Sequence, residues 1–230
     1  MTIKENLNDV LSEIEKSRKN SITGEPVQLI AVSKMHSVEE IEEAISCGIT
    51  CIGENKVQEL SEKIEKLEDK VDYHMIGQLQ TNKVKYIYNK VDLIHSLDRD
   101  SLAKEIDKRA KKDNIKVNCL VQVNIGSEQS KGGLELNEVE DFIENCLKYK
   151  YIKIMGLMTV APNIDDEVLL RKYFKQMYSL KEKIKQKNYD KDILEMKYLS
   201  MGMSQDFKLA IEEGSNMVRV GTNIFGKRNY

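Results

Sequence analysis

The chain contains 230 residues, of which 40% are hydrophobic and 32% are charged, a composition typical of globular proteins. Its 36 basic and 38 acidic residues give a net charge of −2, which argues against a binding surface for nucleic acid or membranes. No apolar run approaches the roughly 20 residues that cross a bilayer. The amino terminus has no apolar secretion segment, so we expect a cytoplasmic protein.

The four cysteines show no spacing typical of a disulfide framework. Cys47 and Cys51 are separated by three residues, but no second pair or nearby histidine completes a zinc site. We therefore expect reduced thiols and no metal. The chain has two prolines and no low-complexity linker, so we predict one domain over residues 1–230.

Apolar residues at helical spacing predict an amphipathic helix over residues 2–19. An almost unbroken apolar run then ends at Lys34, as in a strand of a parallel sheet that is covered on both faces. Ser37, followed by Glu39 and Glu40, predicts a helix start. Strands and helices alternate from there. The expected strands are 27–34, 49–52, 73–76, 91–95, 116–125, 152–158, 196–201 and 217–220, and the expected helices are 38–47, a charged segment to about 69, 81–88, 98–112 with Asp98 as its cap, 137–147, 166–187 and 204–213.

This alternation indicates a parallel sheet with right-handed crossovers. Eight such units match an α/β fold, a (β/α)8 TIM barrel, here preceded by an extra amino-terminal helix. An open doubly wound sheet is the main alternative. If it bound a dinucleotide, it would carry a Gly-x-Gly-x-x-Gly turn after an early strand, and the sequence contains none.

Polar residues and glycines follow the apolar strands at their predicted carboxyl ends. In a barrel these ends meet at one mouth, where active sites lie. Lys34 would there present an amine able to form a Schiff base. The alternative is a lysine that extends past a strand edge into solvent. The predicted mouth residues are Lys34, Glu54, Asn55, His74, Gly77, His95, Ser96, Asn124, Met158, Thr159, Ser200, Met201, Gly202, Ser204, Arg219, Gly221 and Thr222.

The last two units predict an anion site. The segment 200–204 leads directly into a predicted helix, and Gly221 and Thr222 follow the eighth strand. Backbone N–H groups, hydroxyls and a helix dipole favour a phosphate there, although the glycines could serve only the turns. Arg219 alternates to the inner face, where it would either pair with Glu54 or contact a ligand.

An amine and an anion site in one mouth suggest a phosphorylated aldehyde held as an imine, and pyridoxal 5′-phosphate (PLP) is the commonest such cofactor. A phosphosugar aldolase would need a lysine on a later strand, with carboxylates nearby. A barrel that binds a phosphosugar without PLP is a third interpretation.

Six segments, from about Ile30 to the end of the chain, resemble the pyridoxal phosphate homeostasis proteins. That family is similar to the amino-terminal barrel of alanine racemase, in the fold-type III group of PLP proteins. Its usual histidine is replaced here by Gln78, which can still donate a hydrogen bond. The matching segments are 31–34, 53–55 with 58–59, 74–83, 156–158, 199–206 and 218–226.

This resemblance implies that Lys34 carries PLP as an internal aldimine and that Arg219 faces the pyridine nitrogen. It also implies that Ser200, Gly221 and Thr222 hold the phosphate, with Asn55 and His74 beside the ring. Lys131 matches a second family lysine. The full candidate cofactor-binding set is Lys34, Asn55, His74, Ser200, Met201, Gly202, Ser204, Arg219, Gly221 and Thr222.

A charged Arg219 would keep the pyridine nitrogen unprotonated and so weaken PLP as an electron sink. Racemases with this barrel add a second domain that supplies a tyrosine, whereas this chain ends at Tyr230. We therefore expect a monomeric PLP-binding protein of PLP homeostasis and not an enzyme. It would store, protect or deliver PLP to apo PLP-dependent enzymes, and so influence amino-acid and keto-acid metabolism. The alternative is a weak amino-acid racemase acting through Lys34.

Overall fold

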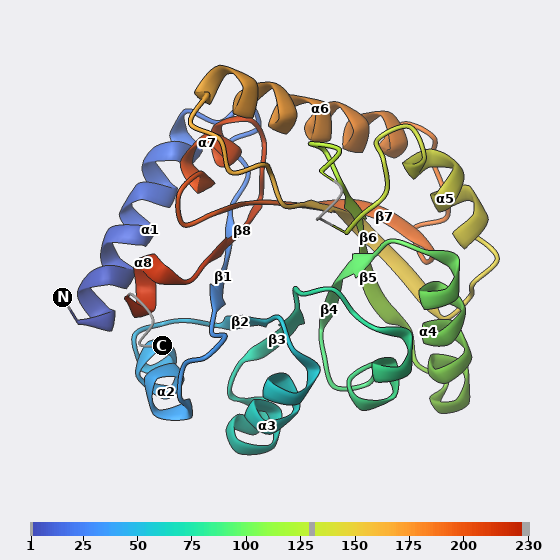
Figure 1. Ribbon diagram of the computed structural model, residues 1–230, viewed down its shortest axis with the longest axis horizontal. Coiled ribbons are helices and arrows are strands. Elements are labelled where there is room, and N and C mark those ends of the chain that lie inside the picture. The colour runs from blue at the N-terminus through green and yellow to red at the C-terminus, as the bar shows by residue number, and fades with distance from the viewer. Residues whose placement is uncertain (1, 129–131, 227–230) are drawn as a thin grey trace.

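The computed structural model describes residues 2–128 and 132–226, which form a closed barrel of parallel strands surrounded by helices (Figure 1). The strands pair in sequence order, and the last returns to pair with the first. This closure confirms the TIM barrel with its additional amino-terminal helix and excludes the open sheet. The strands are β1 (Gln28–Val32), β2 (Cys51–Glu54), β3 (Asp72–Met75), β4 (Leu93–Leu97), β5 (Val117–Val123), β6 (Ile152–Thr159), β7 (Leu194–Met203) and β8 (Met217–Val220).

Helices cover the outside of the barrel (Figure 1). No helix of the described residues is long and apolar enough to span a membrane. The cysteines are free thiols, as expected. The helices are α1 (Ile3–Lys19), α2 (Val38–Ser46), α3 (Val57–Leu67), α4 (Asp100–Asp113), α5 (Val139–Cys146), α6 (Glu167–Lys185), α7 (Phe207–Glu212) and α8 (Thr222–Phe225), with 3-10 helices η1 (Glu68–Lys70) and η2 (Thr81–Tyr86).

Several predicted boundaries were wrong for identifiable reasons. β1 ends at Val32, so Lys34 lies in the following turn. The helix expected over 81–88 is the 3-10 helix η2. Asp98 does not cap α4, because its carboxylate accepts a hydrogen bond from the Arg99 guanidinium and the helix begins at Asp100. Ser37 does cap α2, in a capping box with Glu40.

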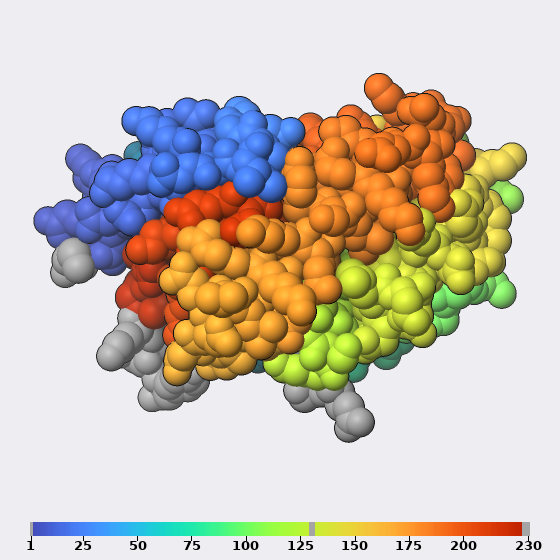
Figure 2. Space-filling model, turned by 90° about the horizontal axis from the view of Figure 1, so that it is seen from above, coloured from blue at the N-terminus to red at the C-terminus, as the bar shows by residue number. Residues whose placement is uncertain are grey.

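The additional helix α1 closes the side of the barrel where the first and last strands meet. It buries Leu7, Val10 and Ile14 and packs against α7 and α8. Figure 2 shows the red segment that contains α7 lying between blue α1 and orange α6. The amino-terminal helix therefore packs on the helices that are last in the sequence.

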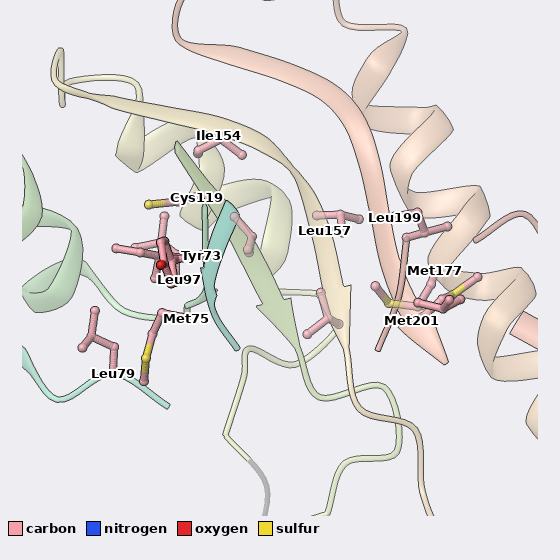
Figure 3. Packing of buried hydrophobic residues seen from close by; sticks show 14 of the residues in the cluster. Tyr73, Met75, Leu79, Leu97, Cys119, Ile154, Leu157, Met177, Leu199 and Met201 are labelled. Atoms are coloured by element: carbon pink, nitrogen blue, oxygen red, sulfur yellow. The ribbon is translucent and has the colours of Figure 1, made fainter. Parts of the chain in front are cut away.

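Alternation along the strands divides the apolar residues into two layers. Outward side chains such as Leu199 and Met201 of β7 pack beside Met177 of α6 (Figure 3). Inward side chains form a smaller cluster inside the barrel, composed of Ile30, Cys51, Leu93, Leu120, Met155, Met158 and Met217. The polar inward residues near the carboxyl ends of the strands are therefore the ones available to a site.

The contact between β6 and β7 requires a glycine. Gly156 has φ +145°, and a Cβ there would collide with the backbone carbonyl of Tyr198. We expect Gly156→Ala to lower the free energy of unfolding by about 3 kcal/mol, the upper end of the cost of backbone strain, because the collision adds to it. Urea denaturation measures this loss.

Gly48→Ala is the control. Gly48 also has a positive φ, +107°, but no atom lies within 4 Å of its Cβ position, so only strain of about 1 kcal/mol is expected. Equal losses in both variants would contradict the importance of the close approach at Gly156.

Candidate functional site

Lys34 lies in the turn after β1, at the mouth of the barrel, and is partly buried. It lines a cavity of about 790 Å³ between the carboxyl ends of the strands and the ends of α6 and α7. The same cavity is lined by Ser204, Arg219, Gly221 and Thr222. The structure therefore brings the predicted amine and part of the predicted anion site to one cavity.

The two loops of the anion site contact each other directly. The Gly221 N–H donates to Ser204 Oγ at 3.3 Å, and Asn223 Nδ2 donates to the Ser204 carbonyl at 3.0 Å. A Cβ at Gly221 would lie 3.1 Å from the Val32 carbonyl oxygen, so the absence of a side chain lets this loop approach β1 closely. Asn223 was not predicted as a site residue, because nothing in the sequence marks the short helix α8.

The helix expected to start at residue 204 begins later. Its N-cap is Asp206 and its first residue Phe207. Asp206 accepts a hydrogen bond from the Met203 N–H at 2.6 Å. Ser204 consequently lies in a turn, and its hydroxyl is used between the two loops rather than as a helix cap.

Arg219 points into the barrel, as predicted, and is almost fully buried. Its Nη1 donates to Ser200 Oγ at 2.6 Å and its Nη2 to the Thr159 carbonyl at 2.7 Å. Burial lowers the pKa of Arg219 to about 10, so the side chain stays charged near neutral pH. The alternative ion pair with Glu54 is wrong, because Glu54 lies on the outer face of β2 and pairs with Lys63.

A hydrogen-bonded chain continues from Arg219 across the barrel interior. Ser200 Oγ lies 3.2 Å from His95 Nδ1, and His95 Nε2 lies 3.0 Å from His74 Nδ1. Arginine can only donate, so Ser200 accepts from it, and the Ser200 hydroxyl hydrogen is available to His95 Nδ1. With Ser200 as the donor to Nδ1, neutral His95 carries its proton on Nε2 and donates it to His74 Nδ1, and neutral His74 carries its proton on Nε2.

Both histidines are held neutral. Burial lowers the pKa of His74 to about 3 and that of His95 well below its ordinary value. The neutral forms are also the ones that the donor chain requires, since a doubly protonated His95 would place a donor against the Ser200 hydroxyl hydrogen. Within this hydrogen-bonded series of side chains, Arg219 is therefore the charged member.

The remaining predicted residues lie away from the cavity. His74 and Ser200 are buried in the hydrogen-bonded series behind Arg219, and Asn55 is exposed beside Gly77.

Met201 points outward against α6 (Figure 3). Gly202 has φ +95°, and its Cβ would lie 2.8 Å from Phe207 Cα, so it permits the packing of α7. Lys131 and Tyr230 are outside the described residues.

The neutral histidines predict a particular dependence of stability on pH. An unfolded histidine has a pKa near 6.5 and gains a proton below it, whereas the folded chain resists protonation. The stability that the two neutral histidines contribute to the folded state is therefore fully present above about pH 6.5. It is lost as the pH falls towards 3. Each histidine contributes a slope of about 1.4 kcal/mol per pH unit in that window.

We expect His95→Gln to be less stable than the wild type and to show a smaller slope, by about 1.4 kcal/mol per pH unit, between about pH 6 and pH 4. Chemical denaturation at a series of pH values measures both slopes. Identical slopes would mean that His95 is not neutral in the folded chain.

Comparisons with known proteins support the same fold. Residues 6–229 match the family model described as alanine racemase, N-terminal domain. Alanine racemase from Clostridium difficile 630 superposes with a TM-score of 0.75 at 18% identity, and the match covers 100% of this chain and 60% of the racemase. At this identity the likeness concerns the fold alone.

Other relatives are similar over their whole length. The pyridoxal phosphate homeostasis protein of Aquifex aeolicus is 44% identical, covering 98% of both chains, and that of Pasteurella multocida is 38% identical, covering 100% of this chain and 99% of the relative. PipY of Synechococcus elongatus, solved with PLP bound, has a TM-score of 0.83 at 31% identity, covering 98% of this chain and 100% of PipY. The chain therefore belongs to the pyridoxal phosphate homeostasis protein family.

Proposed function

We propose that this protein binds PLP in the cavity at the barrel mouth and takes part in PLP homeostasis by storing, protecting or delivering it. The observation that carries the proposal is the shared cavity of Lys34, Ser204, Gly221 and Thr222. The names of the full-length relatives and the PLP-bound structure of PipY support it.

The residues of the cavity fit this cofactor. A volume of about 790 Å³ lies within the range of roughly 300–1,000 Å³ for small-molecule sites. Hydroxyl and backbone N–H donors gather where Ser204 meets Gly221 and Thr222. Of the acidic lining residues, Asp165 and Glu167 come from the segment at the start of α6, and Asp206 accepts from the Met203 N–H, so the phosphate belongs on the β8 side.

Each residue has a role that follows from its chemistry. When bound, PLP supplies an aldehyde that condenses with a primary amine, and Lys34 is the amine of this cavity. Ser204, Gly221 and Thr222 would hold the phosphate. Arg219 would face the pyridine nitrogen as a donor and, because it stays charged, would discourage protonation there.

The polar chain inside the barrel favours holding PLP over transforming a substrate. His74 and His95 bond to each other and to Ser200, and neither lines the cavity. Their part in this proposal is to orient Arg219. Ser200 also acts through Arg219, and Asn55 would approach the ring from the rim. The protein acts as a monomer that passes PLP to apo enzymes.

Lys34→Ala tests the proposal. Wild-type protein mixed with PLP should show the absorption of a Schiff base and should become permanently labelled at Lys34 after borohydride reduction, as mapped by mass spectrometry. Lys34→Ala should lose both signals because no other lysine lines this cavity among the described residues. We expect its affinity for PLP to fall at least about a hundredfold.

Lys56→Ala is the matched control, since Lys56 is a nearby lysine whose side chain is 69% exposed. It should bind PLP like the wild type. Equal labelling of wild type and Lys34→Ala would contradict the proposal. Racemisation of alanine or serine at an enzyme-like rate would favour the racemase alternative.

A further inference from the structure

The turn that carries Lys34 rests on a buried ion pair. Glu54, the last residue of β2, is fully buried, and Lys63 of α3 is 6% exposed. The Lys63 ammonium contacts Glu54 Oε1 and donates to the Ser33 carbonyl at 2.7 Å. Ser33 Oγ donates to the same Glu54 oxygen at 2.7 Å. Ser33 of the turn after β1, Glu54 of β2 and Lys63 of α3 therefore bond to one another in a closed triangle.

The residues after Lys34 are held by the same elements. The Met35 N–H donates to Glu59 Oε2 of α3 at 3.0 Å, and the His36 N–H donates to the Ser33 carbonyl at 3.0 Å. Met35 has φ +66°, a conformation that a residue with a side chain seldom adopts. The backbone thus reverses directly after Lys34. The reversal is held by one hydrogen bond to α3 and by one within the turn.

Alternation connects this triangle to the cavity. Ser33 still continues the pairing of β1 with β2, because its N–H donates to the Gly53 carbonyl at 3.1 Å. Its side chain bonds to Glu54 on the outer face, whereas the next residue, Lys34, lines the cavity. Holding the side chain and carbonyl of Ser33 in the outer layer, between sheet and helices, therefore directs Lys34 to the inner side. Neither Glu54 nor Lys63 lines the cavity, so they can act on a ligand only through the turn.

Stability alone is a poor explanation for charges at this place. A buried ion pair seldom stabilises a protein more than an apolar pair of similar volume. Here the second oxygen, Glu54 Oε2, is buried without a hydrogen-bond partner among the described residues, which is unfavourable. The pair instead fixes the orientation of Ser33, because charge-assisted hydrogen bonds restrict the geometry of the groups they join.

We propose that Glu54 and Lys63 are positioning residues that fix the Lys34 amine towards the cavity and so set how tightly PLP is held. The connection to PLP rests on the proposed function. Lys63→Met alone would leave an unpaired buried carboxylate and destabilise the whole chain. The informative variant is therefore Glu54→Gln/Lys63→Met, which removes both charges and nearly keeps both shapes.

The first measurement uses the protein without PLP. Hydrogen exchange should show the amides of Met35 and His36 exchanging at least about tenfold faster in the double variant, with the strands unchanged, because local opening is read separately from global unfolding. The second measurement is PLP binding. We expect about tenfold weaker affinity and slower labelling of Lys34 by borohydride, since a misplaced amine reacts poorly.

Ile106→Val is the control for general stability. Ile106 is fully buried on α4, which packs against β5 and β6, so this variant should lose stability without changing either measurement. The proposal is overturned if the double variant keeps wild-type exchange at Met35 and His36 and wild-type affinity for PLP, even when its melting temperature falls. A wild type that takes up no PLP would overturn the proposed function, and the exchange data would then decide the positioning proposal alone.

Discussion

The pairing of β1 with β8 is the contact on which the site depends. Ile30 lies opposite Arg219 and Ala31 opposite Val220, and this register determines which residues face each other across the mouth. It sets the turn of Lys34 beside the loop of Gly221, whose missing side chain allows the approach to Val32. A shift of one residue would exchange the inner and outer faces and turn Arg219 away from the interior.

Around that contact, charge is organised in two separate layers. Inside the barrel, Arg219 is satisfied by neutral acceptors, Ser200 and the Thr159 carbonyl. Outside it, Glu54 and Lys63 neutralise each other beneath the turn. Asp206, which lines the cavity, favours the charged form of Arg219, whereas the outer pair holds the backbone of the turn.

The sequence predicted what depends on local pattern. Apolar runs that end in polar residues identified the strands and the edge where Lys34, Arg219 and Thr222 meet. The start of α7 was mistaken because Ser204 resembles a helix cap, while its hydroxyl serves the distant Gly221. Lys63 could not be predicted as a neighbour of Ser33, since that contact joins residues far apart in sequence.

The closure of the barrel also has a consequence for synthesis. Lys34 leaves the ribosome well before Gly221 and Thr222, which follow it in the sequence. The cavity forms only when β8 reaches β1, so a nascent chain exposes the amine long before the matching anion donors exist. Ligand capture is therefore a property of the finished fold, and a chain truncated before its last strand has no cavity to fill.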